Sequence, residues 1–152
     1  MPFQSLDRAD AELAVALASP SIERALADSA VSGLGVLHLV IIDPTARPGE
    51  RPFDSAVLHE ASIGDRSRWD VDYAAYARDK ARTAWRHAMD TRRLATLEPQ
   101  RLGSDDSPLA GGICFEGLVG AASGAMPQWD EAFALMVAGV LRALARSRVS
   151  PS

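Results

Sequence analysis

The residues best suited to bind a ligand recur along one predicted helix in the middle of the chain. Six of them are spaced by 4, 3, 4, 3 and 4 residues: Trp69, Tyr73, Tyr76, Lys80, Thr83 and His87. This spacing places side chains on one face of an α-helix. Phenol, ammonium and imidazole groups on a shared face can line a pocket for a small molecule. The same stripe also suits helix packing or contact between copies of the chain, and both interpretations stay open.

Short catalytic motifs are absent from the sequence. Metal-ligand spacings such as H-x-x-x-H and C-x-x-C do not occur, so we predict no metal site from neighbouring residues. Cys114 lies in an apolar segment with no base close in sequence, and Ser123 lacks the G-x-S-x-G frame. Asp130 and Glu131 are adjacent and point about 100° apart on a helix, so we expect them to complement its dipole rather than act together. Whether the protein is an enzyme is left open.

Length and composition indicate one globular domain over residues 1–152, with an N-terminal helical segment at 1–32 and a core at 35–147. The net charge of −4 argues against a nucleic-acid partner. The longest strongly apolar run, at 36–42, is far shorter than the roughly 20 residues of a membrane span. A single cysteine and an acidic N-terminus without a signal pattern predict a cytoplasmic protein with no membrane partner.

The first half of the chain reads as two helices and two strands. Ser5 is expected to cap a helix at 6–18, which Ser19-Pro20-Ser21 ends before a second helix at 21–30. The β-branched run at 35–43 predicts a buried strand, the proline-rich stretch at 44–52 a loop, and residues 55–62 a second strand.

The second half predicts two helices separated by a hairpin. Residues 68–90 form the clearest helix, whose small side chains we expect to face the core: Ala74, Ala77, Ala81, Ala84 and Ala88. Residues 92–106 read as a surface connection, 111–124 as a β-hairpin turning at Glu116-Gly117, and Pro127 as the start of the last helix, which ends before Pro151. The fold class is therefore α+β, an antiparallel sheet flanked by helices.

Three segments carry a family resemblance: VIID at 40–43, ARDKARTAW at 77–85 and FEGLVGAASGAMPQWDEAFA at 115–134. Together they resemble the family of haem-degrading and haem-binding HbpS-type proteins, GlcG-type proteins and the C-terminal domain of PduO-type proteins. The resemblance implies a profilin-like α-β-α arrangement, a homo-oligomer and a small-molecule ligand. Some members of the family bind or degrade haem, so haem is a candidate cofactor. The segment at 44–65 is longer and richer in proline than in the family, and Gly111-Gly112 lacks the proline that commonly follows, so loops around a pocket differ here.

If haem is the ligand, histidine and tyrosine can hold its iron. His38 lies in an apolar strand and is expected to be a hydrogen-bonded core residue, which leaves His59 and His87 as the first candidates. Lys80 and Arg82 can pair with haem propionates. The stripe residues Tyr73 and Tyr76 complete the set of candidate ligand-binding residues.

Three functional hypotheses follow from these observations. The leading one is a small-ligand-binding, haem-handling oligomer. The second is a small catabolic or biosynthetic enzyme, or an accessory subunit, that acts on a small organic acid near the basic residues Lys80, Arg82 and Arg86. The third is a structural oligomer in which the stripe from Trp69 to His87 is the interface between copies.

Overall fold

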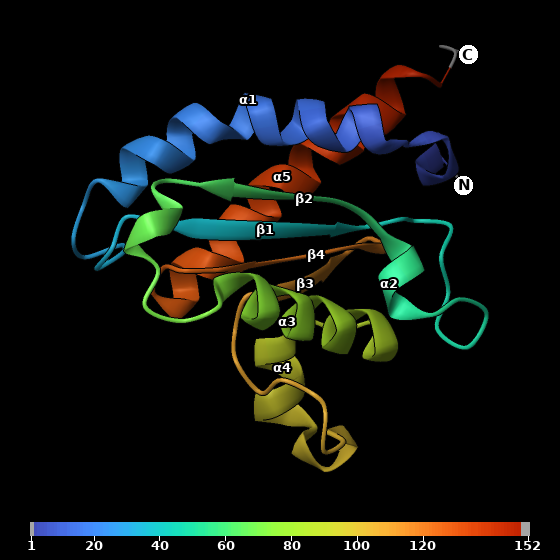
Figure 1. Ribbon diagram of the computed structural model, residues 1–152. Coiled ribbons are helices and arrows are strands. Elements are labelled where there is room, and N and C mark those ends of the chain that lie inside the picture. The colour runs from blue at the N-terminus through green and yellow to red at the C-terminus, as the bar shows by residue number, and fades with distance from the viewer. Residues whose placement is uncertain (1, 150–152) are drawn as a thin grey trace.

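A computed structural model describes residues 2–149 as three layers around a four-stranded sheet (Figure 1). The strands are β1 (Leu37–Ile42), β2 (Val57–Ile63), β3 (Gly112–Phe115) and β4 (Leu118–Ser123), in the order β2-β1-β4-β3 with every pair antiparallel. Helices α1 (Arg8–Leu26) and α5 (Pro127–Ser147) cover one face. Helices α3 (Tyr73–His87) and α4 (Thr91–Leu97) lie on the other. The predicted α+β class is confirmed.

The short elements complete the chain path. Helix α2 (Phe53–Ala56) leads directly into β2, and 3-10 turns occupy Pro2–Ser5, Arg66–Arg68 and Pro99–Arg101. Pro151, which we expected to lie beyond the last helix, is outside the described residues. Among residues 2–149, no helix combines the length and the hydropathy that crossing a membrane requires.

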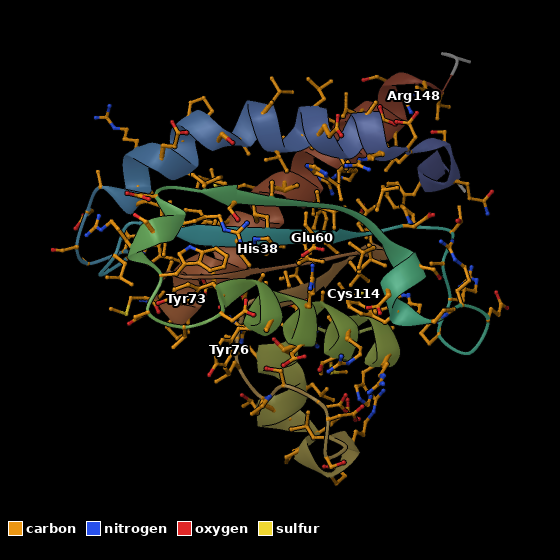
Figure 2. The ribbon with its side chains drawn as sticks, viewed as in Figure 1. His38, Glu60, Tyr73, Tyr76, Cys114 and Arg148 are labelled. Atoms are coloured by element: carbon orange, nitrogen blue, oxygen red, sulfur yellow. The ribbon has the colours of Figure 1, made fainter. Side chains whose placement is uncertain are left out.

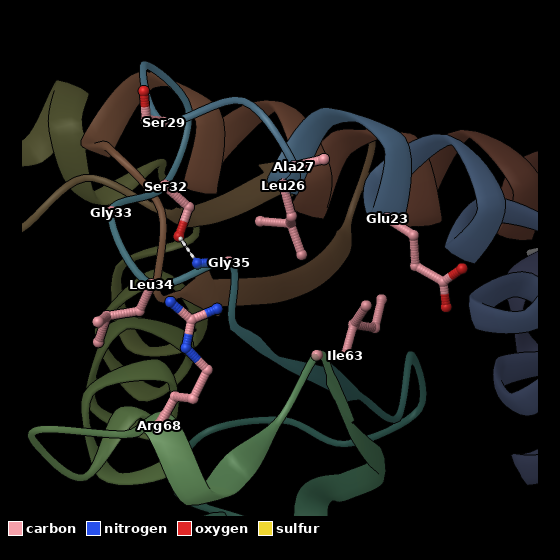
Figure 3. A pocket seen from close by; sticks show the side chains of 11 residues that line it. Glu23, Leu26, Ala27, Ser29, Ser32, Gly33, Leu34, Gly35, Ile63 and Arg68 are labelled. Atoms are coloured by element: carbon pink, nitrogen blue, oxygen red, sulfur yellow. Dashed lines mark hydrogen bonds between the residues drawn. The ribbon is translucent and has the colours of Figure 1, made fainter.

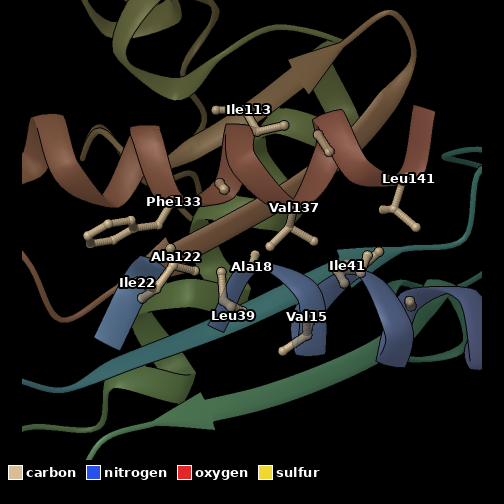
Figure 4. Packing of buried hydrophobic residues seen from close by; sticks show 14 of the residues in the cluster. Val15, Ala18, Ile22, Leu39, Ile41, Ile113, Ala122, Phe133, Val137 and Leu141 are labelled. Atoms are coloured by element: carbon tan, nitrogen blue, oxygen red, sulfur yellow. The ribbon is translucent and has the colours of Figure 1, made fainter. Parts of the chain in front are cut away.

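Strand β1 is the centre of the molecule because it is buried on both faces. Leu37, Leu39 and Ile41 point into the cluster formed with α1 and α5 (Figure 4). Val40 and Ile42 alternate with them and pack in the second cluster, against α3. A run of apolar side chains with no polar face is what a strand between two helical layers requires. The prediction of a buried strand at 35–43 is confirmed.

Helix α3 rests on the sheet through its small residues, as predicted. Ala77, Ala81 and Ala84 are fully buried, because side chains of this size let the helix axis approach the strands closely. The helix begins five residues later than predicted, after Asp72 caps the Ala75 N–H. It ends at His87, three residues earlier than predicted, because Ala88 is a C-cap with left-handed backbone (φ 51°). Ala88 is exposed, so placing it in the buried stripe was wrong.

Helix α1 corrects the prediction of two separate helices. It runs unbroken from Arg8 to Leu26 through Pro20, and its cap is Asp7, in a capping box with Asp10, rather than Ser5. A proline inside a helix costs about 3 kcal/mol. Ile22 and Leu26, which follow it, are buried against the sheet and each contributes roughly 1.5–3 kcal/mol. This tertiary burial outweighs the local break.

Residues 92–106 also contain more structure than the predicted surface connection. Helix α4 begins at Thr91, and Thr91 and Leu94 are fully buried. The Thr91 hydroxyl donates to the Leu109 carbonyl at 2.6 Å and accepts the Gly112 N–H at 3.1 Å. A single threonine therefore holds the last residues of the loop where it enters β3.

The predicted hairpin is confirmed, with its turn at Glu116 (φ 52°) and Gly117 (φ 87°). Left-handed geometry at both central positions matches the twist of the flanking strands. At the other end of β3, Gly112 touches α3: a Cβ on it would lie 2.5 Å from the Lys80 carbonyl oxygen. This contact lets the edge strand approach the helix.

Substituting Gly112 with alanine should therefore destabilise the protein, because the added Cβ meets backbone that cannot move alone. We expect a loss of about 1–3 kcal/mol in the free energy of unfolding, the usual cost of overpacking. Gly139→Ala in α5 is the matched control, since a Cβ there meets nothing within 4 Å. It should gain about 0.5–1 kcal/mol. Urea denaturation of both variants checks the difference, and equal stabilities would contradict the close approach.

Candidate functional site

A cleft opens beside the N-terminal half of α3, with a volume of about 360 Å³. We call it the α3 cleft; its walls also include the start of α5 and the chain before β3. Ligand pockets in proteins generally fall between roughly 300 and 1,000 Å³. Three of the six predicted site residues line it, namely Tyr73, Tyr76 and Lys80. The other lining residues are Val71, Leu109, Ala110, Ser123, Gly124, Ala125, Pro127 and Asp130.

The polar floor of the α3 cleft is a buried ion pair. Lys80 Nζ donates to Asp130 Oδ2 at 3.1 Å and to the Ala122 carbonyl at 3.1 Å. The two side chains are 4% and 5% exposed. Asp130 Oδ1 also accepts the Ala125 N–H at 2.8 Å. The pair therefore joins α3, the end of β4 and the first turn of α5.

Burial dominates the titration of both partners. It lowers the pKa of Lys80, and it raises the pKa of Asp130 to about 6 although the Lys80 charge and hydrogen bonds act against it. Because both side chains are almost fully buried, each charge depends on the other for compensation. The ammonium of Lys80 is committed to Asp130 and Ala122.

Glycine makes the room for this pair. A Cβ on Gly111, whose φ is +126°, would lie 2.9 Å from Lys80 Nζ and 2.6 Å from the Ala122 carbonyl oxygen. Only glycine adopts this backbone freely and leaves the space empty. The Gly111-Gly112 pair therefore encloses Lys80 from the side of β3.

The rim of the α3 cleft is apolar and exposed. Val71, Tyr76 and Leu109 are 46%, 45% and 48% exposed. The Tyr73 hydroxyl donates to Asp70 at 2.5 Å, and burial together with this carboxylate raises the pKa of Tyr73 to about 12. The Tyr76 hydroxyl makes no hydrogen bond to the described residues. Figure 2 shows both tyrosines at the N-terminal end of α3.

The remaining predicted residues lie elsewhere. Arg82 donates to Asp79 at 2.9 Å and to the Asp105 carbonyl at 3.1 Å, beside a neighbouring surface hollow. His87 Nε2 lies 2.7 Å from Asp106 Oδ2 near the end of α3. His59 pairs with Ile41 in the β-ladder and so faces α1, on the other side of the sheet. The cleft therefore gathers the two tyrosines and the lysine, without the histidines.

His38 is a hydrogen-bonded core residue, as expected from its apolar strand (Figure 2). Its Nδ1 lies 2.8 Å from Ser62 Oγ and its Nε2 lies 2.9 Å from Glu60 Oε1. Arg78 donates to both oxygens of Glu60 at 2.8 Å. The edge of the His38 ring meets Trp69 at 5.9 Å between centroids. The network fastens α3 to the outer strand β2.

Sequence reasoning missed two of the residues that organise this region. Asp130 was assigned to the helix dipole, and Glu60 was given no role. Asp130 lies 50 positions from Lys80, so no local spacing connects them. The one available signal was that Lys80 and Asp130 fall in two of the three family-like segments.

Comparison with known proteins identifies the fold. No family model matches the chain, and no curated protein matches it. Among solved structures, the chain is similar to the crystal structure of HbpS, at 22% identity and a TM-score of 0.59 over 90% of this chain and 89% of that one. It is also similar to the crystal structure of a PduOC–haem complex, at 16% identity and a TM-score of 0.55 over 86% and 91%. The protein has an HbpS-like fold, as the sequence resemblance implied.

The Lys80–Asp130 pair allows a direct energetic test. Asp130→Asn keeps the acceptor for Ala125 but leaves a buried ammonium without its counter-ion, which should cost about 3–5 kcal/mol. Lys80→Met leaves the buried carboxylate of Asp130 without its counter-ion and should also destabilise the protein. The double variant removes both charges. Its loss in the free energy of unfolding should be smaller than the sum of the two single losses by at least about 1 kcal/mol. Chemical denaturation of the four proteins measures this coupling.

Glu12→Gln is the control, because its pair with Arg8 is exposed and worth about 0–1 kcal/mol. Additive single losses at Lys80 and Asp130 would show that the two charges do not depend on one another.

The His38 network gives a pH-dependent expectation. Burial lowers the pKa of His38 below 6.5, while Glu60 raises it. Because the unfolded chain then binds more protons, the contribution of this group to stability falls as pH drops below 6.5. Glu60→Gln should lower the pKa of His38 further. NMR titration of the imidazole signals measures both values, and a pKa that rises in Glu60→Gln would contradict the geometry.

Proposed function

We propose that the protein binds a small organic ligand in the α3 cleft, and that this ligand is haem. The observation that carries the proposal is an apolar, exposed rim of Val71, Tyr76 and Leu109 above a floor whose charges are already paired. Exposed apolar side chains gathered around a concavity mark a binding site. The fold likeness to HbpS and to a PduOC structure solved with haem supports the choice of ligand.

The shape of the site suits a flat, largely apolar molecule. The cleft is open on one side and is bordered by aromatic and aliphatic surfaces, against which a porphyrin ring can pack. Neither basic candidate offers a free cation to a propionate. Lys80 is bound to Asp130, and Arg82 lies outside the cleft, where it donates to Asp79 and to the Asp105 carbonyl.

Tyr76 is the iron ligand that the geometry favours among the candidates. Tyrosine ligates haem iron in some proteins, and the Tyr76 hydroxyl lies at the rim without a competing hydrogen bond. Tyr73 donates to Asp70, and its high pKa disfavours the phenolate. His87 lies eleven residues after Tyr76, about 16 Å along the helix axis. His59 faces the opposite layer.

The one-sided cleft also motivates a homo-oligomer. A bound porphyrin would leave one face in water unless a second copy covered it. The same exposed side chains, Val71, Tyr76 and Leu109, can supply that cover. In this arrangement the exposed rim of the cleft, which includes Tyr76 of the stripe, serves both as a pocket wall and as an interface.

Titration of the purified protein with hemin tests the proposal. We expect a sharp Soret band that saturates at a fixed ratio of haem to chain, and light scattering should detect a dimer or larger assembly. Tyr76→Phe should change the ferric spectrum and weaken binding by about tenfold or more, whereas His59→Ala and His87→Ala should leave both unchanged. Loss of the band in a histidine variant alone would transfer the ligand role to that histidine.

A featureless titration, like nonspecific uptake by albumin, would exclude haem. A thermal-shift screen with small carboxylic acids is then decisive for the organic-acid hypothesis, because a ligand selective for the folded state raises its apparent stability.

A further inference from the structure

A second and larger cavity, of about 410 Å³, lies at the opposite end of α1 from its cap (Figure 3). Three segments enclose it: the C-terminal turn of α1, the loop at 32–35, and the chain from the end of β2 to Arg68. We call it the α1-end cavity. None of its lining residues belongs to the α3 cleft.

Arg68 supplies the positive end of this cavity. Its guanidinium points toward the loop at 33–35, and Nη1 would lie 3.7 Å from a Cβ placed on Gly35 (Figure 3). The backbone N–H of Arg68 donates to the Asp65 carbonyl at 3.0 Å, whereas its guanidinium makes no hydrogen bond and no ion pair within 4 Å among the described residues. Asp65 Oδ1 accepts both the hydroxyl and the backbone N–H of Ser67, at 2.7 and 2.9 Å, and these hydrogen bonds, with the more distant charge of Arg68, lower the pKa of Asp65. The Arg68 fork has no direct hydrogen-bond partner within residues 2–149, and it can bind a carboxylate through two parallel hydrogen bonds.

The wall around Arg68 is held in place by backbone contacts. The Ser32 hydroxyl donates to the Gly124 carbonyl at 2.9 Å and accepts the Gly35 N–H at 3.0 Å (Figure 3). Gly64 approaches Gly35 so closely that a Cβ on it would lie 2.3 Å from the Gly35 carbonyl oxygen. Gly33 faces open space, with nothing within 4 Å of its Cβ position. The backbone of the loop at 32–35 and of the turn after β2 is thus held in place, and the exposed side chains of Glu23 and Arg68 extend from the wall of the cavity.

The other end of the α1-end cavity carries negative charge. Glu23 lies on its wall, and α1 ends there at Leu26, so the carbonyl end of the helix faces the same side. The last turn of a helix attracts cations through its unpaired carbonyl groups. Between Glu23 and Arg68 lie the apolar side chains of Leu26 and Ile63 (Figure 3). The order along the cavity is anion, aliphatic surface, cation.

We propose that the α1-end cavity binds an aliphatic amino-carboxylate whose ammonium and carboxylate are separated by a short methylene chain. The carboxylate meets Arg68, the methylenes pack on Leu26 and Ile63, and the ammonium meets Glu23 and the end of α1. We expect a molecule with both charges on one carbon to bind less tightly, because it has no methylene chain to place on the aliphatic surface between the two charged residues. This binding site is independent of the haem proposal, because its residues lie outside the α3 cleft.

The probe is 5-aminovalerate, compared with valerate, which lacks the amine, with pentylamine, which lacks the carboxylate, and with L-norvaline, whose charges adjoin. Amide chemical shifts in two-dimensional NMR spectra of the full chain report weak binding and locate it. We expect 5-aminovalerate to bind several times more tightly than the other three and to shift the signals of Gly33, Leu34 and Gly35. Norvaline or valerate binding as tightly as 5-aminovalerate would overturn the separation of charges.

Substitutions test which residue binds the carboxylate and which binds the ammonium of 5-aminovalerate. Arg68→Gln should weaken 5-aminovalerate to the level of pentylamine, and Glu23→Gln should weaken it to the level of valerate. Arg66→Gln is the matched control, because the Arg66 guanidinium lies 4.4 Å from the Trp69 ring and does not line the cavity. Glu12→Gln serves the same purpose on α1. No shifts with any probe, or equal affinity in Arg68→Gln and the wild type, would overturn the proposal whatever the result with hemin.

Discussion

The buried ion pair between Lys80 and Asp130 is the constraint around which the molecule is arranged. Removing an ammonium and a carboxylate from water costs several kcal/mol each, and only close pairing with further hydrogen bonds offsets this cost. The chain meets that demand from three layers at once: α3 supplies the lysine, α5 the carboxylate, and β4 the Ala122 carbonyl. Misplacing any of the three would strand a charge in the interior. The position of α3 on the sheet is therefore tied to the start of α5.

The surrounding sequence features follow from this requirement. The small side chains of the alanines at 77, 81 and 84 let α3 pack closely on the sheet. This close packing brings Lys80 within hydrogen-bond distance of Asp130. Gly111 leaves space beside the ammonium, and Gly112 lets β3 touch the Lys80 carbonyl. Pro127 starts α5 where Asp130 falls in its first turn. The cleft above the pair is the space that remains between these elements.

The parts of this design that the sequence predicted are those with a local physical cause. The double-sided burial of β1, the turn at Glu116-Gly117 and the start of α5 at Pro127 each follow from neighbouring residues. The prediction errors arose where contacts between residues distant in sequence determine the structure. Burial of Ile22 and Leu26 carries α1 through Pro20, and the role of Asp130 depends on a lysine 50 residues away. Of the candidate site residues, Tyr73, Tyr76 and Lys80 lie together because they share one face of α3. His59 points to the other layer because successive strand residues alternate between the two faces of the sheet.

Charge pairing explains why the basic residues of α3 do not form an anion-binding patch. Four cations of this helix each have an acidic partner within 4 Å: Arg78 with Glu60, Lys80 with Asp130, Arg82 with Asp79, and Arg86 with Asp105. An incoming carboxylate would have to displace one of these acids. Arg68, just before the helix, has no such partner among the described residues and faces a cavity instead. Arg68 is distinguished from the cations of α3 by two features together: within the described part of the chain its guanidinium has no acidic partner within 4 Å, and it lines a cavity.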